Sequence, residues 1–133
     1  MQREMVMTGD AMSMWFYPSQ GIVHHEFHTY MFGEPLRTGL MQGADLLRDR
    51  GASKWLSDDR KNSALHPDDV EWAKTVWFPT ALQNGWKHWA VVWPQKVVGQ
   101  MNMKDFMDTY RALGINAEAF ADPTEAMLWL RRQ

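Results

Sequence analysis

Apolar residues along the chain follow two spacings, and the shorter one predicts β-strands. Between residues 22 and 30 the side chains alternate, so Val23, His25 and Phe27 share one face and the intervening residues share the other. The stretch HWAVVW (88–93) is nearly continuous in apolar side chains, which is typical of a strand covered on both faces. The predicted strands cover residues 12–17, 22–30, 54–57, 88–93 and 115–120.

Other segments place their apolar residues at helical spacing and carry the residues that begin or end helices. Pro67 and Pro123 each suit a first helical position, and Asn102 can cap a third helix. Pro79 lies inside an apolar helical pattern, so we expect a kink or break near Phe78. The predicted helices cover residues 34–50, 67–83, 102–113 and 123–133.

The order of these elements predicts a single small α/β domain. The first two strands are joined by a Pro-Ser-Gln-Gly turn at 18–21, which makes an N-terminal hairpin. Strand and helix then alternate, which favours parallel strands with right-handed crossovers. We therefore expect β-β-α-β-α-β-α-β-α with a mostly parallel sheet over 12–133, and a loose or weakly paired segment at 1–11.

Composition narrows the functional classes. The 133 residues carry a net charge of −2 and a pI of about 6.2, so no basic surface for nucleic acid is expected. There is no cysteine, which excludes disulfides and thiolate chemistry. No apolar run approaches the ~18 residues of a membrane span, and residues 1–16 lack a signal-peptide core. We expect a cytoplasmic protein.

A series of motifs in the middle of the chain resembles the small bacterial proteins called SpoIIAA-like or STAS-like. The resemblance extends in element order over about residues 12–133 and includes the closing phrase AFADPTEAMLWL. It implies a small α/β sheet with a hairpin at one end. The matching positions are Asp58, Arg60, Leu65, Pro67-Asp68-Asp69, Trp72, Trp77, Pro79, Gly85, Lys87 and Ala90-Val91-Val92.

The resemblance stops at the regulatory serine. In the anti-sigma-factor antagonists of this class, an Asp-Ser-Ser-Gly phrase opens the helix after the central strand. Here the corresponding residues are Leu65-His66-Pro67-Asp68, and Ser63 lies too early to match. The phosphorylation switch is therefore not carried over, and other relatives of this fold hold lipids in an apolar cavity instead.

Residues 57–72 hold the densest group of candidate functional side chains. Asp68 and Asp69 follow Pro67, where the helix dipole favours negative charge, and we interpret them as a helix start capped by His66 or a neighbour. Asp58 directly follows a strand, at the carboxyl edge where α/β folds bind ligands. Its alternative role is to accept loop N–H groups or to pair with Arg60.

No motif predicts a catalytic, metal or cofactor site. His24, Glu26 and His28 alternate on one strand face, but positions i and i+4 of a strand lie ~13 Å apart, too far for one ion. His25, on the apolar face, is interpreted as a satisfied, half-buried histidine and not as a metal ligand. Nucleophile elbows, Cys–His pairs and phosphate loops are absent from the sequence.

Eight tryptophans exceed the usual need of one core of this size. They predict a bulky core, an aromatic pocket or a homodimer interface. We expect a non-enzymatic regulatory or protein-binding module of STAS-like type, with a carrier of a small apolar or lipid-like ligand as the alternative and an enzyme centred on Asp58 as the third. The candidate ligand or partner residues are Asp58, Arg60, Ser63, His66, Trp72, Trp77, Trp89 and Trp93.

Overall fold

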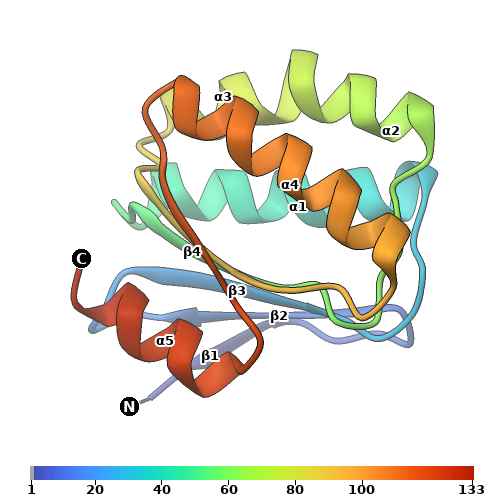
Figure 1. Cartoon of the computed structure of the whole chain (residues 1–133). Helices are drawn as coiled ribbons and strands as arrows, with labels where there is room; N and C mark the ends of the chain where they lie inside the picture. Colours follow the sequence, from blue (N-terminus) through green and yellow to red (C-terminus); the bar gives the residue numbers. More distant parts are fainter. Residues whose placement is uncertain (1) are drawn as a thin grey trace.

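Six strands form one sheet whose spatial order follows the chain, β1-β2-β3-β4-β5-β6. The structure is a computed structural model that describes residues 2–133 (Figure 1). The predicted interior position of HWAVVW is confirmed, because β5 pairs with β4 on one side and β6 on the other. The strands are β1 (Glu4–Met7), β2 (Met12–Tyr17), β3 (Ile22–Phe27), β4 (Lys54–Asp58), β5 (His88–Val92) and β6 (Asn116–Phe120).

The expectation of a mostly parallel sheet is wrong, because the sheet is mixed. β1 with β2 and β2 with β3 are antiparallel, whereas the pairs from β3 to β6 are parallel. The physical reason is connection length: residues 8–11 and 18–21 suffice only for antiparallel neighbours, whereas parallel ones need a crossover. Part of the segment 1–11 that was expected to be loose or weakly paired forms β1, which is also tied to α1 by the Glu4–Arg50 ion pair.

Helices cover both faces of the sheet. In Figure 1, α5 lies on one side of the strands, and α1, α4 and the α2–α3 run lie on the other. The third predicted helix begins earlier than expected, so Asn102 lies inside α4 and does not cap it. The helices are α1 (Gly33–Asp49), α2 (Pro67–Trp72), a π-helical turn η1 (Ala73–Trp77), α3 (Phe78–Gln83), α4 (Val97–Ala112) and α5 (Pro123–Arg131).

The irregularity expected from Pro79 is the π-helical turn η1, which immediately precedes α3. Proline has no N–H and its ring crowds the carbonyl four residues earlier, so a widened turn lets the helix continue. The run from 67 to 83 therefore stays helical. The widened turn holds Ala73 and Trp77, both buried, and Trp77 donates its indole N–H to the Leu40 carbonyl (2.8 Å).

Strand alternation divides the core into two parts. The smaller part, under α5, includes Leu56, Ala90 and Val92, while the larger part lies under the other helices. Trp15 and the four tryptophans of the larger core are buried, and the other three are half-buried. The tryptophan surplus therefore fills the core. The rings do not form the exposed patch on which the homodimer expectation was based. The larger core contains Trp55, Trp77, Trp86 and Trp89.

Candidate functional site

A partly open cavity of about 60 Å³ lies in the larger core, at the carboxyl ends of β3, β4 and β5. This is the edge where α/β sheets commonly bind ligands. Its walls are mainly apolar and aromatic: Phe27, Leu36, Leu40, Leu65, Ala73, Trp77, Trp89, Pro94, Met103, Phe106 and Tyr110. Its polar lining residues are His25, Ser57, Asp59, Asn62, Ser63 and Asn102.

Strand alternation decides which polar residues reach the cavity. His25 and Ser57 are partners in the parallel β3–β4 pairing, and both face the larger core. Asp59 follows two residues after Ser57 and points to the same side, whereas Asp58 between them points to the other. The backbone N–H of Asp59 is held by the Val92 carbonyl (3.2 Å), which anchors the loop start to β5.

A buried chain of hydrogen bonds fixes the state of His25. The indole N–H of Trp55 donates to Nδ1 (2.9 Å), so this nitrogen must present a lone pair. The proton then sits on Nε2, which donates to Asp59 Oδ1 (3.0 Å). His25 is therefore a neutral imidazole, and it has no free nitrogen with which to accept a proton from a substrate.

Two polar groups in the wall have unused hydrogen-bonding capacity. The residues Asn62 and Tyr110 are 4% and 2% exposed, and neither Asn62 Oδ1 nor the Tyr110 hydroxyl has a hydrogen-bond partner within residues 2–133. Burial raises the pKa of Tyr110 well above its usual value of 10.0, so the phenol keeps its proton. Such groups destabilise a fold by ~1–3 kcal/mol unless something binds them.

The mouth of the cavity lies between the loop after β4 and helix α4. Ser63 and Leu65 on the loop and Asn102 and Met103 on the helix are all half-buried lining residues. The backbone N–H of Leu65 donates to Asn102 Oδ1 (3.1 Å), which ties the two sides together. This contact explains Asn102, which sequence reasoning had placed at a helix cap.

The helix also comes very close to the loop at one glycine. A side chain at Gly99 would place its Cβ 2.8 Å from Pro94 Cβ and 3.4 Å from the Ser63 carbonyl carbon. Only a residue without Cβ fits this approach unstrained. Gly99 therefore allows α4 to approach Pro94, which lines the cavity.

Cavity size limits what can bind. One water needs ~10–15 Å³ of such space, so about 60 Å³ accommodates roughly four atoms of that size. A long acyl chain exceeds this volume. The cavity suits a small molecule or the end group of a larger one that extends through the mouth.

Asp58 and Arg60 lie outside the cavity lining and bind each other. Arg60 donates from Nε and Nη2 to the two carboxylate oxygens of Asp58 (2.9 and 2.8 Å), in a bidentate ion pair. The backbone N–H of Arg60 also approaches Asp58 Oδ1 (3.4 Å). These are the two alternative roles considered for Asp58, loop acceptor and partner of Arg60. The side-chain hydrogen bonds that Arg60 donates to Asp58 also raise the pKa of Arg60.

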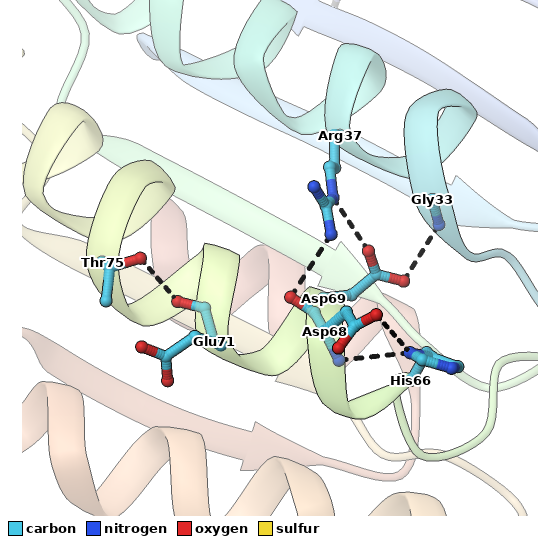
Figure 2. A network of polar contacts seen from close by, with 7 residues as sticks. All are labelled: Gly33, Arg37, His66, Asp68, Asp69, Glu71 and Thr75. Atoms are coloured by element: carbon cyan, nitrogen blue, oxygen red, sulfur yellow. Dashed lines mark hydrogen bonds and ion pairs between the residues drawn. The ribbon is translucent and has the colours of Figure 1, made fainter.

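The stretch after the loop is a helix start, as predicted, but its two aspartates differ (Figure 2). His66 is the N-cap: its Nδ1 accepts the Asp68 backbone N–H (3.1 Å), and Pro67 occupies the first turn. The Asp68 side chain is 84% exposed, whereas the residue Asp69 is 1% exposed. Both sit in the first turn, where the dipole favours them.

Asp69 additionally caps a different helix. Its Oδ2 accepts the backbone N–H of Gly33 (3.0 Å) and its Oδ1 accepts Arg37 Nε (2.9 Å), as Figure 2 shows. Helix α1 has no side-chain cap from Phe32, its own N-cap residue. The carboxylate of Asp69 therefore supplies the missing acceptor and joins α1 to α2.

The alternating histidines in and just after β3 do not converge. His24 Nδ1 bonds the Tyr17 hydroxyl (3.1 Å), and His28 Nε2 bonds Ser13 Oγ (2.8 Å). Burial lowers the pKa of His24 to about 4, so this ring is neutral at pH 7. In the part of the chain that the structure describes, no three metal-binding side chains come together.

Of the eight residues named from sequence, three line the cavity: Ser63, Trp77 and Trp89. Trp72 instead lies beside α1, with the Arg37 guanidinium 5.5 Å from its ring centre, and Trp93 packs against the larger core. The remaining three, Asp58, Arg60 and His66, have the structural roles described above.

Sequence reasoning did not select the polar residues that matter most in the cavity. These are His25, Asp59, Asn62 and Tyr110. The position of Asp59 could have been predicted from strand alternation. Residues 55, 57 and 59 share one face, and this is the face that carries Trp55. Asn62 has no comparable signal, since its position depends on the loop.

Over residues 2–133, no helix is both long and apolar enough to cross a bilayer. No family model, curated protein or solved structure matches this chain significantly. The chemistry of the cavity is therefore the basis for a functional proposal.

Proposed function

We propose that this protein is a non-enzymatic binding module, on a STAS-like scaffold, that holds a small molecule in the cavity at the carboxyl edge of β3–β5. The observation that supports this proposal most is the pair of unpartnered polar groups, Asn62 Oδ1 and the Tyr110 hydroxyl, in a mainly apolar and aromatic wall. Binding sites typically combine an apolar lining with a few polar groups that orient the ligand. A ligand would also supply the missing hydrogen bonds.

The state of His25 argues for binding over catalysis. A general base needs a free lone pair near the substrate, but Nδ1 of His25 is occupied by the Trp55 indole and Nε2 carries the proton. Ser57 Oγ accepts the Trp89 indole N–H (2.8 Å) rather than bonding a base. Asp58, the centre of the enzyme hypothesis, is bound by Arg60.

Burial of the aromatic rings favours a small molecule over a broad aromatic docking surface. Every tryptophan is buried or half-buried. A regulatory role then means that ligand occupancy changes the loop and α4, which meet at the Leu65–Asn102 hydrogen bond. Such coupling requires that the ligand bind one arrangement more tightly than the other.

The test is binding of small probes, followed through the indole N–H signals of the eight tryptophans in ¹H–¹⁵N NMR spectra. The probes are isopropylammonium, propan-2-ol and acetate, which share one size and differ in charge. We expect at least one probe to shift the Trp77 and Trp89 signals saturably and to leave Trp129 unchanged. Trp129 belongs to α5 and packs against the smaller core, on the far side of the sheet.

Filling the cavity gives a matched control. Ala73→Leu adds three carbons to a buried lining position in η1, whereas Ala64→Leu adds them to a half-buried residue of the loop after β4 that does not line the cavity. The first variant should abolish the indole shifts and the second should preserve them. If no probe produces a saturable shift at Trp77 or Trp89, the proposed function is wrong.

A homodimer, a protein partner and a cytoplasmic location stay predictions. Light scattering that finds twice the chain mass of 15.5 kDa at micromolar concentration would support the homodimer. A single chain mass at all concentrations would contradict it.

A further inference from the structure

We infer that the ligand of this cavity is a small organic cation, an ammonium group that carries at least two N–H bonds and a short apolar substituent. The inference rests on the proposed function and specifies its ligand class. It follows from one buried carboxylate, that of Asp59, and from the surroundings that leave this carboxylate without a positive partner.

Asp59 is a buried acid with few partners. The residue is 2% exposed and lines the cavity. Within residues 2–133, the one hydrogen bond to its carboxylate comes from His25 Nε2. An ionised carboxylate offers about four acceptor positions, and burial is costly unless a charge or several donors compensate it. Most of this capacity is unused.

His25 does not supply the missing positive charge. To become an imidazolium it would need a proton on Nδ1, the nitrogen that accepts the indole N–H of Trp55. Trp55 is fully buried, and its ring lies against Gly43 of α1, so it cannot easily turn away. Trp55 therefore keeps His25 neutral, and the charge of Asp59 remains uncompensated.

The rest of the cavity also favours a cation. No lysine or arginine is among its lining residues, so an anion would meet Asp59 without any compensation. Asn62 Oδ1, an unpartnered acceptor, lies in the same tight turn, closed by the hydrogen bond from the Asn62 N–H to the Asp59 carbonyl (3.1 Å). Two acceptors close together match an ammonium that donates two hydrogen bonds.

The aromatic walls suit both parts of such a ligand. Trp89 and Tyr110 face the cavity with ring centres 5.6 Å apart, and Trp77 completes the wall. Ring faces attract an ammonium through their negative quadrupole, and they also accept a short hydrocarbon group. With space of about 60 Å³, the substituent has only a few carbon atoms if the whole ligand is enclosed.

The three probes, which match in size and differ in charge, test this inference on the unmodified protein. At constant ionic strength and pH 7, isopropylammonium should bind about tenfold more tightly than propan-2-ol. Hydrogen bonds to charged groups contribute more free energy than neutral ones, and the difference corresponds to roughly this change in affinity. Acetate should bind more weakly than either. Saturable binding of propan-2-ol or acetate that equals or exceeds that of isopropylammonium would overturn the cation inference while leaving the proposed function standing.

Paired variants locate the effect. Asp59→Asn keeps the shape and the acceptor for His25 but removes the charge, so the preference for isopropylammonium over propan-2-ol should disappear. Asp58→Asn removes a neighbouring charge outside the cavity lining and should leave that preference intact. Loss of the preference in Asp58→Asn, or its persistence in Asp59→Asn, would show that Asp59 is not the partner. If Asp59→Asn does not fold, the probe series on the unmodified protein still decides.

Discussion

The two neighbouring aspartates of the α2 start should differ sharply in what they contribute to stability. Asp69→Ala removes the acceptor of the Gly33 N–H and the partner of Arg37. Asp68→Ala removes a carboxylate that is 84% exposed. Adjacent positions with the same residue type make the pair its own control, because helix propensity and dipole effects are nearly matched.

The magnitude follows from the contacts. A hydrogen bond from a backbone N–H to a buried charged group contributes ~1.5–3 kcal/mol. The Arg37 pair adds up to ~1 kcal/mol, because the arginine side chain is 29% exposed. Asp69→Ala should therefore cost about 3 kcal/mol, and Asp68→Ala only the ~0.3–1 kcal/mol of the dipole interaction. For 133 residues, 3 kcal/mol corresponds to a fall in Tm of ~11 °C.

Urea denaturation followed by tryptophan fluorescence measures both variants. The midpoint should fall strongly for Asp69→Ala and slightly for Asp68→Ala, with an unchanged m-value. Arg37→Ala, alone and combined with Asp69→Ala, completes a cycle in which the two losses should not add. Equal losses for the two aspartates, or a larger loss for Asp68→Ala, would refute the role of Asp69 as the cap of α1.

Four further variants test other parts of the fold. Gly43→Ala should lower the free energy of unfolding by ~1–2 kcal/mol in urea denaturation, because the new methyl overlaps the buried Trp55 ring and overpacking outweighs the gain in helix propensity. Gly39→Ala should cost less, since its methyl meets only the flexible ends of methionine side chains. Equal costs for the two variants would contradict this reasoning. Tyr110→Phe should leave the free energy of unfolding unchanged or raise it by ~1 kcal/mol, because its hydroxyl is unpartnered, so a clear loss would reveal a partner. His24 has a pKa of about 4 in the folded chain and near 6.5 in the unfolded chain, so between these pH values the unfolded chain binds the proton more readily. The contribution of His24 to the free energy of unfolding is therefore complete above pH 6.5 and is lost towards pH 4, by up to ~1.4 kcal/mol per pH unit. His24→Gln should remove that part of the pH dependence, and an identical profile would contradict the assignment.

Local patterns were sufficient for most elements. The alternation of residues 22–27, the continuous apolar run of β5 and the prolines at helix starts each depend on neighbours only a few residues away. The same holds for the cap at His66 and for the irregularity before Pro79. These features were predicted because their causes are steric or hydrogen-bonding effects within one or two turns of chain.

Tertiary structure decided which polar residue does what. Asp58 and Asp59 are indistinguishable by type, yet one pairs with Arg60 and the other bonds a histidine 34 residues away in the cavity. Asp69 caps a helix whose first residue lies 36 positions earlier. The start of α4 and the pairing of β1 with β2 were also missed, whereas the antiparallel hairpin of β2 and β3 was predicted. Burial and long-range hydrogen bonds arise only when strands and helices pack, so no local spacing could reveal them.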